Sequence, residues 1–198
     1  MHAKRERGWF DTAERGWWSR AMTSPERRLR ELNIELPGLL PAAGAYVAAK
    51  RHNDVVHLSG HGPLALDRLP RNTGEPYTVD AVLGALIQGK VGSDLSLEEG
   101  KDAARSVGLL LLATLRDELG SLDEVRSVLK VFGMVNCTPD FMGAAAVIDG
   151  CSELLLDVFG EEVGRHARSA PGVAVLPFNV PVVIEMIVAT DPPPPSHR

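Results

Sequence analysis

The spacing of apolar and polar residues predicts two long helices. In residues 97–119 apolar or small side chains recur three and four positions apart. Ser96 and Glu99 just before this run form a capping-box pattern, and Gly120 marks its end. Pro139 opens a second helical pattern that stops near Gly160. The positions that define the two apolar faces are Ala104, Val107, Gly108, Leu111 and Leu115, then Ala146, Leu154, Leu155 and Val158.

Shorter runs rich in β-branched residues predict strands. They form the order β-β-α-β-α-β-β with the two long helices, and a short helix capped by Ser24 and Pro25 precedes them. This order predicts an α/β fold, in the sense of an α+β two-layer arrangement, in which two helices cover one face of a mixed sheet. The other face still carries apolar residues, so we expect it to be covered by oligomerisation. The strand ranges are 46–50, 54–59, 125–135, 173–176 and 182–188, with a polar turn at 51–53.

The two ends differ in composition from the rest. Residues 1–21 hold all three tryptophans and five basic against three acidic residues. They are expected to be a disordered leader, and the alternatives are a docking arm or a translation start at Met22. Residues 22–190 are expected to form a single domain, and the proline-rich residues 191–198 a disordered tail. Residues 66–86 belong to a long irregular segment that either covers a pocket as a lid or lies outside it.

Composition excludes several classes of protein. The chain has 198 residues, a net charge of −5 and two cysteines. A disulfide framework or a four-cysteine zinc site is therefore not expected, and the acidic balance argues against a nucleic-acid partner. The apolar runs are too short for a membrane helix. We expect a soluble, cytoplasmic protein with no membrane partner.

Few residues suggest chemistry by themselves. His57 and His61 are four apart, but they fall on a predicted strand and have no further ligand beside them, so no metal site is expected. Cys137 and Cys151 are expected to be buried thiols. Arg168 precedes an apolar strand, where its planar guanidinium group could bind a carboxylate ligand through two hydrogen bonds. A surface ion pair with a residue such as Glu161 or Glu162 is an equal alternative. Glu185 interrupts an apolar strand and faces solvent or a polar site.

Together, several motifs resemble the reactive-intermediate deaminase family, also called Rid/YjgF or endoribonuclease L-PSP-like. The resemblance covers residues 24–189, apart from 66–86. It rests on His166-Ala167-Arg168-Ser169-Ala170, Leu176-Pro177, Ile184-Glu185-Met186-Ile187, Leu58-Ser59-Gly60 and Gly44-Ala45-Tyr46. The longer YjgF-like, chorismate-mutase-like branch is indicated by Gly89-Lys90-Val91-Gly92, Asp94-Leu95-Ser96, Val135-Asn136 and Pro139-Asp140-Phe141.

The resemblance implies a chorismate-mutase-like fold and a homotrimer with its pockets between subunits. It implies an enamine/imine deaminase that hydrolyses a small 2-imino acid to a keto acid and ammonia without a cofactor or metal. Arg168 would hold the substrate carboxylate and Tyr46 would orient the substrate. The other residues implied to line the pocket are Ser59, Gly60, Asp149 and Ser169.

The sequence departs from the family pattern at three positions. Val183 stands where the resemblance implies a water-orienting glutamate, Asp149 where it implies an asparagine, and Ala170 where a cysteine is frequent. Valine cannot orient or deprotonate water, so Asp149 is one candidate for the missing base. The alternative function is a non-catalytic trimer that binds a small carboxylate metabolite. The endoribonuclease activity attributed to some relatives is disfavoured by the acidic charge.

Overall fold

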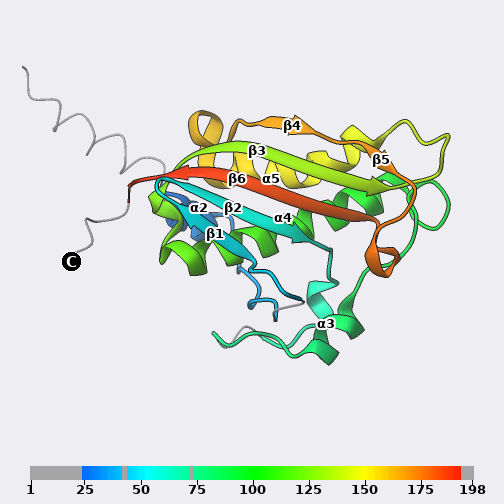
Figure 1. Ribbon diagram of the computed structural model, residues 1–198, viewed down its shortest axis with the longest axis horizontal. Coiled ribbons are helices and arrows are strands. Elements are labelled where there is room, and N and C mark those ends of the chain that lie inside the picture. The colour runs from blue at the N-terminus through cyan, green and yellow to red at the C-terminus, as the bar shows by residue number, and fades with distance from the viewer. Residues whose placement is uncertain (1–23, 42–43, 72–73, 193–198) are drawn as a thin grey trace, which may run out of the picture.

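The computed structural model describes residues 24–41, 44–71 and 74–192. One mixed sheet has the strand order β1-β2-β6-β3-β4, and β5 also pairs with β3 (Figure 1). β3 runs parallel to β4 and β5, whereas its pairing with β6 is antiparallel. The mixed sheet predicted from the sequence is confirmed. The strands are β1 (Ala49–His52), β2 (Val55–His61), β3 (Val125–Asn136), β4 (Ala167–Ser169), β5 (Gly172–Val173) and β6 (Val182–Thr190).

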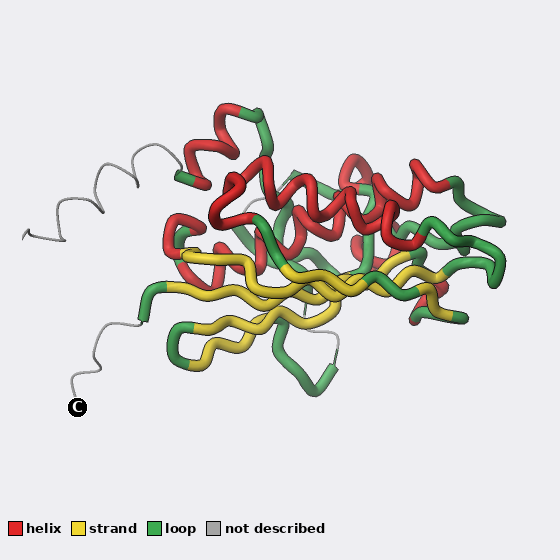
Figure 2. The backbone as a smooth tube through the Cα atoms, turned by 90° about the horizontal axis from the view of Figure 1, so that it is seen from above, coloured by secondary structure: helices red, strands yellow, loops and turns green. Residues whose placement is uncertain are grey.

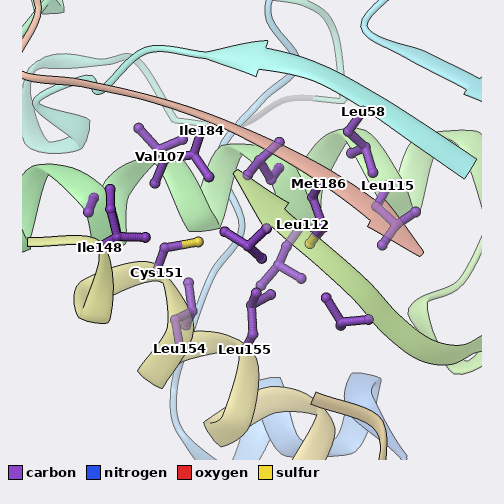
Figure 3. Close-up of a cluster of buried hydrophobic side chains, with 14 of the residues drawn as sticks. Leu58, Val107, Leu112, Leu115, Ile148, Cys151, Leu154, Leu155, Ile184 and Met186 are labelled. Atoms are coloured by element: carbon purple, nitrogen blue, oxygen red, sulfur yellow. The ribbon is translucent and has the colours of Figure 1, made fainter. Parts of the chain in front are cut away.

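Two long helices, α4 (Leu97–Leu119) and α5 (Ala144–Gly164), lie on the same side of the sheet (Figure 2). The predicted capping box is present, because the Ser96 hydroxyl accepts from the Glu99 amide and the Glu99 carboxylate accepts from the Ser96 amide. The core fills the space between the helices and the strands, and the buried side chains labelled in Figure 3 come from both layers. The two-layer arrangement is thus confirmed.

Short helices complete the chain. α2 (Pro25–Glu31) is capped by Ser24, as expected. α3 (Val79–Ala85) and a 3-10 helix (Leu66–Arg68) lie within the segment 66–86. This segment packs through Ala85 against Leu110 of α4. Other 3-10 turns are Leu122–Glu124 and Pro177–Asn179.

Several predicted boundaries were wrong. The second long helix begins at Ala144 rather than at Pro139, because residues 138–141 form a turn closed by a 3.1 Å hydrogen bond from the Phe141 amide to the Thr138 carbonyl. The predicted stop near Gly160 coincides with a break, because Gly160 adopts φ 74° and ψ 175°, and a further short helical stretch then continues to Gly164. The predicted strand 173–176 is the two-residue β5, and the first strand begins at Ala49, not at 46.

The predicted leader, 1–21, lies outside the described residues, as does most of the predicted tail. Asp191, the first residue of that tail, is held in place. Its carboxylate pairs with Arg126, and its carbonyl accepts a 2.7 Å hydrogen bond from Arg51. No helix within the described residues is long and apolar enough to cross a membrane.

The sheet face opposite α4 and α5 carries apolar side chains that are only half-buried. Residues alternate along β6, where Val182, Ile184 and Met186 face the helices and Val183 and Ile187 face away. On β3 the corresponding outward residues are Phe132 and Met134. These four outward residues form an apolar patch, named here the open sheet face: Phe132, Met134, Val183 and Ile187.

Candidate functional site

Arg168 lies on the edge strand β4, opposite Val131 of β3. Val131 is wholly buried beneath the helices, so Arg168 at the same level also points toward the helix layer. There its Nη1 donates to Asp149 Oδ1 at 2.6 Å and to Ser152 Oγ at 3.0 Å, both on α5. Among the guanidinium nitrogens of Arg168, only Nη1 has a hydrogen-bond partner within the described residues, so Nε and Nη2 keep donors that are not used there.

His166 joins this arrangement through Ser152. Its Nε2 lies 3.0 Å from Ser152 Oγ, and its Nδ1 lies 2.7 Å from the carbonyl oxygen of Gly164. Ser152, His166 and Arg168 line one hollow of about 230 Å³, together with Leu156 and the exposed Arg165. We call this hollow the Arg168 pocket.

Tyr46, Ser59 and Gly60 lie elsewhere, in a second pocket of about 270 Å³ beside β1 and β2. We call it the Tyr46 pocket. The Ser59 hydroxyl donates to the Val47 carbonyl at 2.7 Å, which ties the segment that carries Tyr46 to β2. The Tyr46 side chain is largely exposed. The structure therefore brings three of the expected site residues together, but not with Arg168.

His61 closes the inner side of the Tyr46 pocket. Its Nδ1 lies 2.7 Å from the Ser59 carbonyl and its Nε2 lies 2.9 Å from Thr114 Oγ1. A carbonyl only accepts, so Nδ1 carries the hydrogen and Nε2 accepts from the Thr114 hydroxyl. Burial lowers the pKa of His61, which keeps the ring neutral at pH 7.

The remaining expected residues divide between the two faces. Asp149 contacts Arg168 directly, so the ion-pair partner of Arg168 is Asp149 and not Glu161 or Glu162. Glu161 pairs with Arg165 instead. Ser169 faces away from Arg168, and its hydroxyl accepts a 2.8 Å hydrogen bond from Lys130.

Val183 lies on the open sheet face against Gly60. A Cβ placed on Gly60 would be 2.7 Å from Val183 Cγ1, so a larger residue there would force the valine side chain or the strand to move. Glu185, two residues further along β6, is exposed on the same face. The position at which the resemblance implies a glutamate is thus apolar and lies nearer to the Tyr46 pocket than to Arg168.

Sequence reasoning missed Ser152 and gave His166 no role. Two spacings could have revealed them. Asp149 and Ser152 are three apart on one helix, so they share a face. His166 and Arg168 are two apart in an extended segment, so they share a side.

Other candidate groups carry no chemistry here. Burial raises the pKa of the Cys151 thiol to about 12, so it is not a nucleophile in the folded protein. Within residues 24–41, 44–71 and 74–192 no cluster of three histidine, cysteine or acidic side chains could hold a metal.

Lys90 of the Gly89–Gly92 motif ties loops together. Its ammonium group donates to Asn136 Oδ1 and, at 2.8 Å, to the Ala174 carbonyl. Asn136, wholly buried at the end of β3, donates in turn to Asn179 Oδ1 at 3.0 Å. These bonds give Lys90 a structural role in joining the loops at this end of β3.

Comparison with known proteins gives the family. The sequence profile described as "YjgF/chorismate mutase-like, putative endoribonuclease" matches residues 26–189. Protein TCP17 of Trypanosoma cruzi is 38% identical over 160 residues, which cover 81% of this chain and 90% of that protein. The chain belongs to the YjgF (Rid) family.

Solved structures agree on the fold. The Agrobacterium tumefaciens protein Atu1372, of unknown function, is 32% identical with a TM-score of 0.68; the match covers 89% of this chain and 99% of that one. A Shewanella oneidensis MR-1 protein with a similar endoribonuclease description is 28% identical with a TM-score of 0.71, over 84% of this chain and 99% of its own. The fold class inferred from the resemblance is confirmed.

Proposed function

We propose that the protein hydrolyses a small 2-imino acid, or the enamine acid in equilibrium with it, to a 2-keto acid and ammonia. The observation that carries this proposal is the state of Arg168. Its Nη1 is fixed by Asp149 and Ser152, its Nε and Nη2 have no hydrogen-bond partner among the described residues, and the side chain lines the Arg168 pocket. These two nitrogens can hold a carboxylate through two parallel hydrogen bonds. The electrophilic C=N carbon is one bond from this carboxylate and is therefore held in the same hollow.

The Asp149 carboxylate does not prevent anion binding. It is bonded to one nitrogen of the guanidinium and is partly exposed, so solvent screens its charge. Its contact also fixes the orientation of the fork before the ligand arrives. Asp149 as the missing base is less well supported, because its Oδ1 already accepts from Arg168.

We further propose that the site is completed by a second copy of the chain in a homotrimer. Between β2 and β4 the sheet has two strands, β6 and β3, so the Tyr46 pocket and the Arg168 pocket are separated by roughly 14 Å of sheet. In a closed ring of copies joined head to tail, the Arg168 pocket of each copy would lie beside the Tyr46 pocket of the next copy. Such a ring would also cover the open sheet face.

The test is a coupled assay. An amino-acid oxidase generates 2-imino acids in the presence of semicarbazide, and the protein is expected to suppress semicarbazone formation. Arg168→Ala should abolish the suppression, whereas Arg30→Ala, at an exposed position on α2, should not. If wild type is inert with several imino acids while pyruvate still binds in an Arg168-dependent manner, the protein is a carboxylate-binding module instead.

The shared site has its own test. Light scattering should give three times the 21.3 kDa chain mass. Arg168→Ala and Tyr46→Phe should each impair activity alone. Activity should return when the two variants are assembled together, because some interfaces then combine an intact Arg168 with an intact Tyr46. Absence of complementation in a confirmed mixed oligomer would contradict a site shared between copies.

A further inference from the structure

We infer that Ser152 and His166 form a proton relay that serves the Arg168 pocket in place of the absent glutamate. The inference rests on the proposed function, because it assigns the acid-base groups of the same reaction. Its basis is the set of hydrogen bonds around the Ser152 hydroxyl, which fix the direction in which that hydroxyl can pass a proton.

The tautomer of His166 follows from its partners. Nδ1 lies 2.7 Å from the Gly164 carbonyl oxygen, which can only accept, so Nδ1 carries the hydrogen. In the neutral ring Nε2 is then a bare acceptor, and it lies 3.0 Å from Ser152 Oγ. This is the arrangement in which a backbone carbonyl orients an imidazole for proton transfer at its other nitrogen.

The direction of the Ser152 proton follows as well. Arg168 Nη1 donates to Oγ and cannot accept, so the hydroxyl hydrogen points at His166. One lone pair of Oγ receives the arginine, and the second is available to a water in the pocket. Ser152 has only 9% of its surface exposed, so that water would occupy a sheltered position beside the guanidinium.

The step balances without a further reagent. Water adds to the C=N carbon of the protonated imine, and the π electrons move to nitrogen. The proton lost by water passes to Ser152 Oγ as the serine proton moves to His166 Nε2. The histidine then returns a proton to the amine nitrogen through the same hydroxyl. Ammonia leaves with the C–N electron pair. It then takes up the hydroxyl proton of the tetrahedral intermediate as the keto group forms.

The charged groups that line the hollow with His166 are cationic. Arg165 and Arg168 line the same hollow. Asp149 is paired with Arg168, and Glu161 is paired with Arg165 at 3.6 Å. No carboxylate among the described residues forms a hydrogen bond or ion pair with the imidazole, so the ring itself accepts the proton.

The test compares the pH dependence of kcat in wild type, Ser152→Ala and His166→Gln. We expect both substitutions to lower kcat about 100-fold, the lower end for loss of general base catalysis, with pyruvate affinity within threefold of wild type. His166→Gln should also remove the fall in kcat on the acid side. Ser106→Ala, at a serine buried to the same 9%, and His57→Gln, at an exposed histidine, are matched controls and should behave as wild type.

A second measurement does not depend on the variants. Nitrogen-15 spectra of labelled wild type should show the His166 ring as the Nδ1–H tautomer at pH 8. An Nε2–H tautomer overturns the relay. So does an active wild type whose kcat and acid limb survive His166→Gln, and in that case the proposed function stands. An inert wild type removes the proposed function and the relay with it.

Discussion

The close approach of α4 and α5 at Gly150 makes a sharp prediction for Gly150→Ala. A Cβ at this position would lie 2.0 Å from the carbonyl oxygen of Lys101 on α4. The obstacle is backbone and cannot turn aside as a side chain would, so the two helices must separate by more than about 1 Å to regain van der Waals contact. The substitution therefore overpacks the layer that holds Asp149 and Ser152.

The magnitude follows from two opposing contributions. Overpacking a core costs typically 1–3 kcal/mol, and a clash with backbone belongs at the upper end, about 3 kcal/mol. Replacing glycine by alanine within a helix returns about 1 kcal/mol. The free energy of unfolding should fall by about 2 kcal/mol, which lowers Tm by roughly 4–8 °C for a chain of this length.

Gly84→Ala is the matched control. Gly84 lies on α3, and a Cβ there meets no atom within 4 Å. The same chemical change should therefore raise the unfolding free energy by up to about 1 kcal/mol. Urea unfolding followed by circular dichroism, at one fixed protein concentration, measures both variants. If Gly150→Ala unfolds at the same urea concentration as wild type or higher, the account of this helix contact is wrong.

Three further predictions concern single side chains. Burial lowers the pKa of His61 from 6.5, so the contribution of its neutral ring to stability is complete above pH 6.5. This contribution is lost as pH falls toward the folded-state pKa, at up to about 1.4 kcal/mol per pH unit. The acid-induced drop in Tm between pH 7.5 and 5.5 should therefore shrink in His61→Gln and persist in His57→Gln. Asp149→Asn should tighten pyruvate binding roughly fivefold by calorimetry, since it removes an anion next to Arg168; unchanged or weaker binding would show that orientation of the arginine outweighs its charge. Cys151, whose pKa burial raises to about 12, should resist iodoacetamide at pH 8 until urea unfolds the protein.

The elements of the fold were predictable because their signals are local. The capping box and the regular apolar face predict the helix from 97 to 119, and both are present in the structure. The predicted boundaries of elements were wrong where contacts outside the element determine its ends. Pro139 is a good first residue of a helix, but the Thr138–Phe141 turn delays the start to Ala144. A glycine with positive φ commonly ends a helix, and Gly160 does break this one, but the chain then resumes helical geometry as far as Gly164.

The site was predictable only in part. The family motif led to Arg168 and its helix neighbour Asp149, and the structure pairs them. Nothing local indicates that Tyr46 and Ser59 lie at the opposite edge of the sheet, because strand order depends on long-range pairing: β6, from the end of the chain, inserts between β2 and β3. The open sheet face, by contrast, could be expected from counting two helices against one sheet.

The Arg168 pocket is built from two simple periodicities. On α5 a spacing of three places Asp149 and Ser152 on one face. At β4 a spacing of two places His166 and Arg168 on one side of the chain, while Ala167 and Ser169 point to the other. Each pair alone is an ordinary surface feature. They become a site because β4 pairs with β3 in parallel, which sets the edge strand alongside α5. A single-residue insertion between His166 and Arg168 would turn one of them to the opposite face, so the pocket depends on this spacing as much as on the residues themselves.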